Sequence, residues 1–208
     1  MTVLALSGSP RRNGNSETLL QRALDELASL GKQSRVIRLN ELAIRPCQGC
    51  GGCDKTGLCV IDDDMQEIYR AIDAADQLLL VSPIYFYGLT AQAKTAVDRS
   101  QAPWSRRYAL RQPPPHPRGN ERLAYLLSIG ATRGEKLFDG ALLSARYAFD
   151  AMGFSWGGAL LLRNLDERGA AASNPEALEQ AAALGRCIAA GTPLPSTERA
   201  AAAVGTSS

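Results

Sequence analysis

Hydrophobic and polar positions along the chain predict strands that alternate with helices. Short apolar runs of the kind found in buried parallel strands are each followed, directly or after a loop, by a segment with apolar residues at helical spacing. The predicted strands are residues 2–7, 33–39, 77–82, 122–129 and 155–162. The predicted helices are residues 18–30, 66–75, 90–99, 138–152 and 175–190.

Five strands, each followed by a helix, predict an α/β fold with a doubly wound parallel sheet. Right-handed crossovers leave few topologies, and we expect the flavodoxin-like strand order 2-1-3-4-5. Residues 1–194 then form one domain, with a cysteine-rich loop at 45–65 after the second strand. Residues 101–121, rich in Pro, Arg and Gln, are expected to be a long surface connection. Residues 195–208, rich in Ala, Ser and Thr, are expected to be a disordered tail.

The cysteine-rich loop carries four of the five cysteines, at the spacing C-x2-C-x2-C-x5-C. Short C-x2-C steps with sulfur ligands alone are typical of iron–sulfur clusters, and the intervening glycines supply the backbone freedom that a tight loop needs. A structural zinc site and redox-active or idle thiols are the alternatives, although zinc sites more often use two C-x2-C pairs set well apart. The spacing favours a cluster. The candidate metal ligands are Cys47, Cys50, Cys53 and Cys59.

The loops after the first, third and fourth strands are expected to meet at the carboxyl edge of the sheet, where such folds bind ligands. The first loop, residues 7–18, suits a phosphomonoester because it places hydroxyl and amide donors and an arginine beside a helix start, whose N–H groups attract anions. A polar turn with an ordinary helix cap is the alternative. The donors are Ser7, Ser9, Asn15, Ser16 and Thr18, and the positive charge comes from Arg11 or Arg12.

The other two loops suit a flat ring system. Tyr85, Phe86 and Tyr87 are consecutive aromatic residues that such a ring would bury, and the backbone amides of residues 84–88 can bind the polar edge of a flavin. A loop buried against a partner subunit is a compatible alternative. The segment 128–135 can line the other side of the ring, or it is an ordinary strand–helix turn. Its candidate residues are Ser128, Gly130 and Arg133.

Together these motifs resemble a known family. S-G-S-P-R-x-x-G-N-[ST] after the first strand, S-P-I-Y-F-Y-G after the third, and Asp98-Arg99 resemble the NADPH-dependent FMN reductase branch of the flavodoxin-like fold. The cysteine pattern followed by V-I-x-D-D-M resembles the iron–sulfur flavoproteins within that branch.

The resemblance implies an FMN-containing iron–sulfur flavoprotein that passes electrons between a [4Fe–4S] cluster and FMN to a small-molecule acceptor. No catalytic acid or base of the protein is expected. NAD(P)H and a ferredoxin-like protein are the candidate electron donors, and a homodimer or homotetramer is expected. The cluster ligands are Cys47, Cys50, Cys53 and Cys59; the phosphate contacts are Ser9, Arg11, Asn15, Ser16 and Thr18; the isoalloxazine contacts are Pro83, Ile84, Tyr85, Phe86, Tyr87 and Gly88.

Composition gives little reason to expect nucleic-acid binding, membrane spanning or histidine-based catalysis. The net charge of +2, without a long basic run, gives no reason to expect a nucleic-acid partner. No apolar stretch approaches membrane-spanning length and no signal pattern is present, so we expect a cytoplasmic protein whose cysteines serve metal or redox chemistry. A single histidine, His116, leaves little room for Ser-His-Asp chemistry. An NAD(P)H-dependent FMN or quinone reductase without iron, and a non-enzymatic zinc or redox-sensing module, are the alternative functions.

Overall fold

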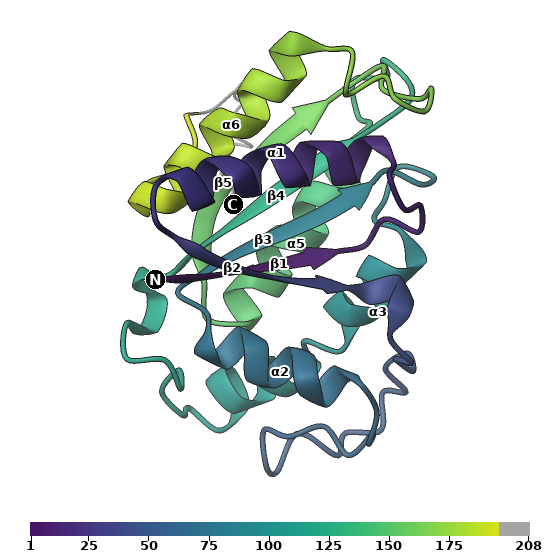
Figure 1. Ribbon diagram of the computed structural model, residues 1–208. Helices are drawn as coiled ribbons and strands as arrows, with labels where there is room; N and C mark the ends of the chain where they lie inside the picture. Colours follow the sequence, from purple (N-terminus) through teal and green to yellow (C-terminus); the bar gives the residue numbers. More distant parts are fainter. Residues whose placement is uncertain (196–208) are drawn as a thin grey trace, which may run out of the picture.

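The computed structural model of the chain describes residues 1–195 and contains one five-stranded parallel sheet between two layers of helices (Figure 1). The strands lie in the order β2-β1-β3-β4-β5, and every neighbouring pair is parallel. The predicted flavodoxin-like fold is therefore confirmed. The strands are β1 (Thr2–Ser7), β2 (Gln33–Arg38), β3 (Gln77–Pro83), β4 (Leu123–Ile129) and β5 (Ser155–Leu162).

The main helices follow the strands as predicted, with small differences at their ends. The first begins at Asn15 rather than residue 18, because the N–H of Thr18 already bonds to the carbonyl of Gly14. The main helices are α1 (Asn15–Ser29), α2 (Met65–Ala74), α3 (Ala91–Asp98), α5 (Asp139–Ala151) and α6 (Pro175–Ala190). The short helical segments are η1 (Leu39–Glu41), α4 (Gln101–Trp104), the π-helix η2 (Ser105–Ala109) and η3 (Gly119–Glu121).

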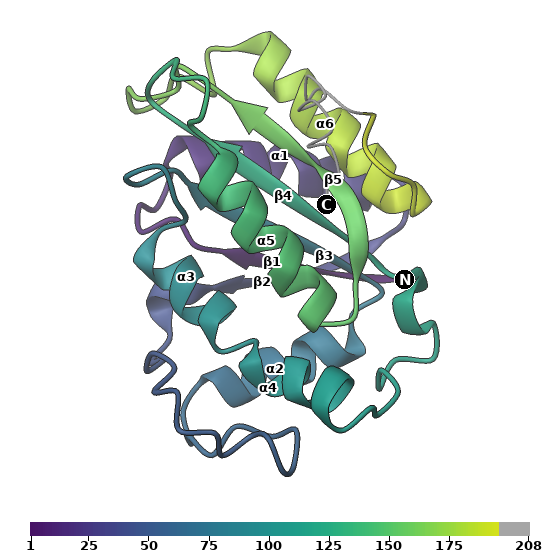
Figure 2. The same cartoon turned by 180° about the vertical axis from the view of Figure 1, so that it is seen from behind.

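Alternating side chains of the strands build a separate core on each face of the sheet. Val3 and Ala5 of β1 pack in the core under α1 and α6, whereas Leu4 and Leu6 pack in the core under α2, α3 and α5. Figures 1 and 2 show the same division, with α1 and α6 together on one face and α2, α3 and α5 on the other. Helices therefore cover both faces of the sheet. Ligands in folds of this kind bind at the carboxyl ends of the strands.

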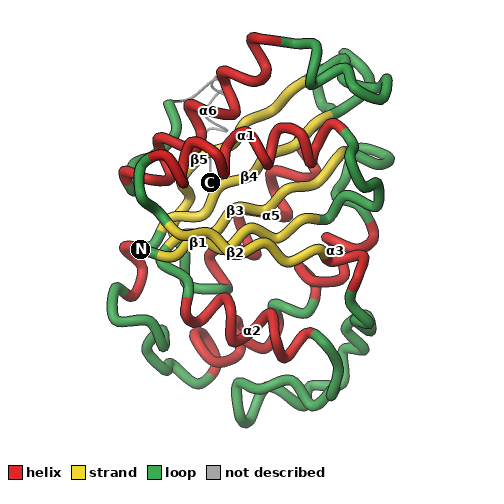
Figure 3. Tube along the Cα trace, in the orientation of Figure 1, coloured by secondary structure: helices red, strands yellow, loops and turns green. Residues whose placement is uncertain are grey.

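The prediction that residues 101–121 form a surface connection is wrong for their first half. Residues 101–109 are helical, with α4 labelled beside α2 in Figure 2, and Ala102, Pro103 and Ser105 are buried. Figure 3 marks the helices in red and the strands of the sheet in yellow. Pro103 is compatible with this helix because it stands in the first turn, where its missing N–H has no intrahelical partner. Arg106 pairs with Asp73 of α2 at 2.7 Å, which holds the segment against the body of the protein.

The expected disordered tail lies, except for Pro195, outside the described residues. The division into a domain at 1–194 and a tail stays a prediction.

Candidate functional site

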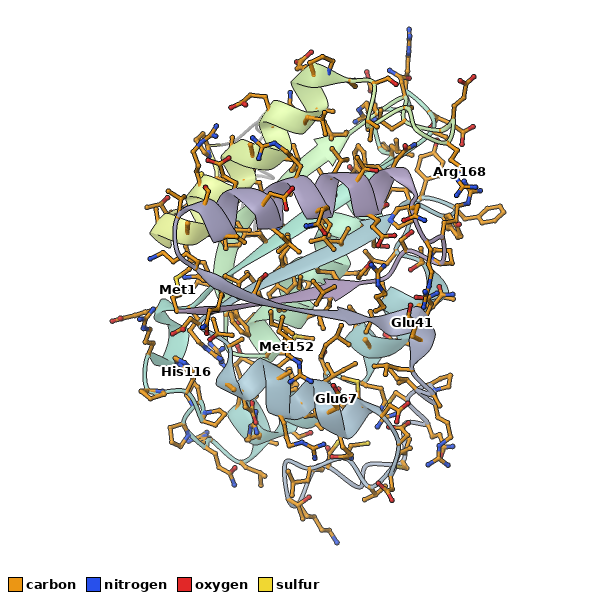
Figure 4. The ribbon with its side chains drawn as sticks, viewed as in Figure 1. Met1, Glu41, Glu67, His116, Met152 and Arg168 are labelled. Carbon is orange, nitrogen blue, oxygen red and sulfur yellow. The ribbon has the colours of Figure 1, made fainter. Side chains whose placement is uncertain are left out.

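A cavity of about 450 Å³ opens at the carboxyl edge of the sheet, where the loops after β1, β3, β4 and β5 meet. Figure 4 shows Arg168 at this end of the molecule, near the start of α1. Cavities of this size suit cofactors and drug-sized ligands. The predicted site residues that line it are Ser9, Arg11, Asn15, Ser16, Pro83, Ile84, Tyr85 and Gly130.

The loop after β1, which the sequence predicts to bind a phosphate, lines one part of this cavity. The hydroxyl of Ser9 accepts a hydrogen bond from the N–H of Arg11 at 3.3 Å, which folds the loop into a tight turn. The first N–H groups of α1 have no partner within the helix, and the helix dipole adds positive potential there. Arg12 pairs with Glu41 at 2.7 Å, whereas the Arg11 guanidinium has no ion-pair or hydrogen-bond partner among residues 1–195. Arg11 is therefore the uncommitted cation of this loop.

Thr18 and Asn15 already use their side chains within the protein. The Thr18 hydroxyl donates to the carbonyl of Gly14 at 3.3 Å, and Thr18 does not line the cavity. The amide of Asn15, only 7% exposed, donates to the carbonyls of Leu165 and Glu167 and accepts from the N–H of Ala171. A phosphate contact by these two side chains stays a prediction.

Glu17 stabilises the turn that precedes α1. Asn13 has a positive φ of 55°, and its N–H donates to the Glu17 carboxylate. Arg38 at the end of β2 pairs with the same carboxylate. Burial alone would raise the pKa of Glu17, but the bonds from Arg38 and the Asn13 N–H outweigh it, so the pKa lies below its ordinary value.

The loop after β3 ends in a tight turn whose aromatic tip is strained. Tyr85 and Gly88 exchange two backbone hydrogen bonds of 3.0 Å, and the central residues Phe86 and Tyr87 have φ of 49° and 62°. Such left-handed backbone is costly for residues other than glycine. Pro83, Ile84 and Tyr85 line the cavity, whereas Phe86, Tyr87 and Gly88 do not, and the Phe86 side chain is fully exposed.

Two glycines allow this turn to approach α5. A Cβ at Gly140 would lie 2.7 Å from the carbonyl oxygen of Tyr87, and a Cβ at Gly134 would lie 2.9 Å from the Tyr87 hydroxyl. Both distances are below normal contact, so any larger residue would displace the turn or the tyrosine ring.

The loop after β4 contributes less to the cavity than the sequence predicts. Gly130 lines the cavity, but Ser128 is fully buried and its hydroxyl donates to the carbonyl of Ser82 at 2.7 Å, which ties β4 to β3. Arg133 does not line the cavity and donates to the side chain of Asn164 at 3.1 Å. Their predicted cofactor contacts gain no support from this geometry.

Sequence reasoning missed the fourth wall of the cavity, the loop after β5. Leu165, Asp166 and Arg168 of this loop line the cavity. The sequence could have predicted this wall, because β5 is also a parallel strand and its carboxyl end lies at the same edge of the sheet. The polar run N-L-D-E-R-G that follows β5 is the feature that identifies it.

The two ends of the cysteine-rich loop are fixed by one buried arginine. Arg99, 1% exposed, pairs with Asp63 at 2.7 and 3.1 Å and donates to the carbonyl of Arg45 at 2.8 Å. Asp63 also accepts from the N–H groups of Arg45 and Met65. Burial opposes ionisation, but these bonds keep the pKa of Asp63 below its ordinary value. Tyr69 adds a hydrogen bond of 2.8 Å to the carbonyl of Arg99.

The four sulfurs between these ends are not gathered. Cys53 is buried, 3.6 Å from the Ser105 hydroxyl, whereas Cys47 and Cys50 are exposed and Cys59 is half-buried. Within residues 1–195 no three His, Cys, Asp or Glu side chains form a group that could hold a metal ion. The donor set fits a four-thiolate centre in number and chemical type. Its ligand geometry requires the loop to rearrange.

The glycines of this loop behave largely as expected. Gly49 and Gly51 have φ of 61° and 68°, so their predicted conformational freedom is used. Gly52 serves a different purpose, because a Cβ there would lie 2.7 Å from a methyl group of Val60.

Comparison with known proteins agrees with the fold and the motifs. The sequence model of the family described as NADPH-dependent FMN reductase matches residues 1–142. The chain is 42% identical over 101 residues to an iron–sulfur flavoprotein of Methanocaldococcus jannaschii, covering 49% of this chain and 52% of that protein. It is 32% identical over 133 residues to an iron–sulfur flavoprotein of Methanosarcina thermophila, covering 64% and 65%. The chain thus spans about half to two thirds of the length of these relatives.

Solved structures share the fold. An NAD(P)H:quinone oxidoreductase from Methanothermobacter marburgensis superposes with a TM-score of 0.68 at 18% identity, covering 90% of this chain and 96% of that one. A Trp repressor binding protein from Bacillus subtilis gives a TM-score of 0.58 at 21% identity, covering 88% and 96%. In the part of the chain that the structure describes, no helix is both long and apolar enough to cross a membrane.

Proposed function

The chain belongs to the NADPH-dependent FMN reductase family, and from this premise we propose that it binds FMN at the carboxyl edge of its sheet and acts as a flavin-dependent oxidoreductase. Its similarity to iron–sulfur flavoproteins, which confirms the resemblance predicted from the motifs, supports the assignment to that branch. The electron donor and the acceptor are part of the proposal, with NAD(P)H or a ferredoxin-like protein as donor and a small molecule as acceptor.

The observation that carries the proposal is the cavity itself. It joins an end suited to an anion, made by Ser9, Arg11 and the start of α1, to a more apolar wall made by Pro83, Ile84 and Tyr85. This is the polarity that a molecule with a phosphate at one end and a ring system at the other requires. The carboxyl edge beside the switch between β1 and β3 is also where ligands bind in this fold.

The protein supplies binding and orientation, and the cofactor supplies the electron chemistry. FMN, when bound, accepts and releases one or two electrons. Ser9 and the N–H groups of Asn15 and Ser16 bind the phosphate, and Arg11 neutralises its charge. Pro83 to Tyr85 hold the ring, and the glycine-supported turn behind them fixes the position of that wall.

The test is to identify what the purified protein binds. We expect flavin absorption bands, release of FMN rather than riboflavin or FAD on denaturation, and loss of the bands when NADPH or a reduced ferredoxin is added without oxygen. Protein that takes up no flavin after incubation with excess FMN would contradict the proposal.

We further propose that Cys47, Cys50, Cys53 and Cys59 hold a [4Fe–4S] cluster, which would supply single-electron transfer. The four-thiolate donor set and the names of the relatives support this. The ends of the loop are fixed and the sulfurs between them stand apart, which suits a site that closes on its metal, because metal sites couple ligand binding to local folding.

Metal analysis separates this proposal from two others. Roughly four irons and four sulfides per chain after anaerobic purification support the cluster, and Cys53→Ala should then lose the iron while Cys187→Ala keeps it. Flavin without iron after anaerobic reconstitution favours an NAD(P)H-dependent FMN or quinone reductase. This function is also in keeping with the separation of the four sulfurs. A Bacillus subtilis relative is named a putative NAD(P)H-dependent FMN-containing oxidoreductase. Zinc without flavin favours a non-enzymatic zinc or redox-sensing module.

We also propose that the chain acts as a homodimer or homotetramer. Phe86 is fully exposed and Tyr85 and Tyr87 are partly exposed on the turn that follows the cavity wall, and a second subunit would bury them. Analytical ultracentrifugation measures the state, and a monomer at micromolar concentration would contradict this part of the proposal.

A further inference from the structure

The loop after β5, residues 163–174, brings a charged residue to the cavity that the loop after β1 also lines. Arg168 lines the cavity together with Ser9, Arg11 and Ser16. Figure 4 shows Arg168 at the carboxyl end of the sheet. None of the motifs that resemble the FMN reductase family includes this residue, so its presence beside Ser9 and Arg11 requires its own explanation.

Asn15 fixes the loop that carries Arg168. Its amide nitrogen donates to the carbonyls of Leu165 at 3.1 Å and Glu167 at 2.8 Å, and its amide oxygen accepts from the N–H of Ala171 at 3.1 Å. Both donors of the amide and one acceptor position are thus used on either side of residue 168. Because Asn15 is also the first residue of α1, the loop is fixed directly to the helix start that attracts anions.

Arg168 itself is uncommitted. It has no ion pair or hydrogen bond with any residue of the described chain. Its neighbours at this edge differ, since Arg12 pairs with Glu41, Arg133 bonds to Asn164, and Arg163 bonds to the carbonyls of Gly134 and Glu135. Arg11 and Arg168 therefore remain as the free guanidinium groups that line the cavity.

The charges that line the cavity leave a positive excess. Arg11, Arg12 and Arg168 face one carboxylate, Asp166, among the lining residues. Arg12 is already neutralised by Glu41, and Asp166 can offset only one of the other two arginines. A phosphate dianion is the ligand chemistry that balances the remaining charge and the helix dipole.

We propose that Arg168, from the loop after β5, binds the phosphate of FMN together with Arg11, and that it makes the protein select FMN over riboflavin. This rests on the proposed function, that the cavity binds FMN. Asn15 acts as a positioning residue, holding the loop that presents Arg168 to the phosphate.

The experiment titrates flavin-free protein with FMN and with riboflavin and follows quenching of flavin fluorescence. We expect Arg168→Gln to weaken FMN binding about tenfold, the loss of one partly exposed charge-assisted hydrogen bond, while riboflavin binding stays unchanged. Arg168→Lys should recover part of the loss, and the gap between wild type and Arg168→Gln should narrow as salt is added. Arg70→Gln is the control, because it removes the same charge from an exposed position on α2.

Two results would overturn the inference. An equal loss for FMN and riboflavin would mean that Arg168 shapes the loop without contacting the phosphate, and an unchanged FMN affinity would mean that it makes no contact. Wild-type protein that binds neither flavin would instead refute the proposed function, so the two failures are distinguishable.

Discussion

The cavity and the cysteine-rich loop differ in how far their ligand-binding groups are preorganised. Around the cavity, Asn15, Glu17 and Ser9 already bond their loops into place, and the lining residues face a common space. In the cysteine-rich loop only the ends are fixed, by Arg99 and Asp63, and the sulfurs between them stand apart. The cavity is complete in advance because hydrogen bonds within the protein hold its loops, whereas the four sulfurs need the bonds to a metal to bring them together.

Removing the arginine that fixes the cysteine-rich loop should have the largest effect. Arg99→Met leaves the buried Asp63 with only the exposed Arg45, 4.0 Å away, as a cationic partner, and we expect a loss of about 3 kcal/mol in the free energy of unfolding. Chemical denaturation measures this, and Asp63→Asn in the same chain should restore part of the loss because the uncompensated charge disappears. The control is Lys94→Met, whose exposed pair with Asp98 contributes about 0.5 kcal/mol or less. Equal effects of the two variants would show that the buried pair does not hold the loop.

The matching change at the cavity is Asn15→Ala. It leaves two carbonyls and one N–H of the loop after β5 without their partner, and we expect a loss of about 2 kcal/mol, measured in the same way. FMN affinity should fall as well, because the fourth wall of the cavity is no longer fixed. Thr18→Val is the control, since it removes one bond outside the cavity. FMN binding unchanged in Asn15→Ala would mean that the wall is held by other contacts.

The contacts removed in these two variants could not be predicted from the sequence, whereas much of the fold could. Periodicity identified the strands, the main helices and the edge where the loops after β1, β3 and β4 meet, because buried faces impose regular spacing. It could not show that Ser128 points to Ser82, or that Arg99 spans both ends of the cysteine-rich loop, because these contacts join residues far apart in the chain. The helical residues 101–109 were missed because the segment contains a proline and leads into the proline-rich residues 112–117, and because tertiary contacts such as Arg106 with Asp73 are not visible in local sequence.

Acid should weaken both regions, the cysteine-rich loop more than the cavity. The pKa values of Asp63 and Glu17 are both lowered by folding, so each carboxylate stabilises the protein above its unfolded pKa and loses this contribution as pH falls through the folded value. Asp63 is the more buried of the two, with 5% of its side chain exposed against 17% for Glu17.

The free energy of unfolding should therefore fall from neutral pH to below about pH 4, near and below the ordinary carboxylate values. Asp63→Asn should flatten this dependence more than Glu17→Gln does, each by roughly 1 kcal/mol or less across the range. A steeper pH dependence in either variant than in wild type would contradict the assigned direction of its pKa shift.

The smallest expected effect concerns which residues occupy positions of positive φ in the two regions. The cysteine-rich loop places Gly49 and Gly51 at such positions, where they cost little, whereas the turn beside the cavity places Phe86 and Tyr87 there. Phe86→Asn should stabilise the flavin-free protein by about 0.5 kcal/mol, because asparagine tolerates this conformation and the exposed ring contributes no core packing. Phe86→Ala is the control, since alanine removes the ring but keeps the backbone cost. Stabilisation by asparagine and not by alanine would show that the strain lies in the backbone. A weakened oligomer or slower flavin reduction in both variants would show that the exposed ring contributes to assembly or to activity. Equal stability of the two variants would mean that the turn carries no such strain.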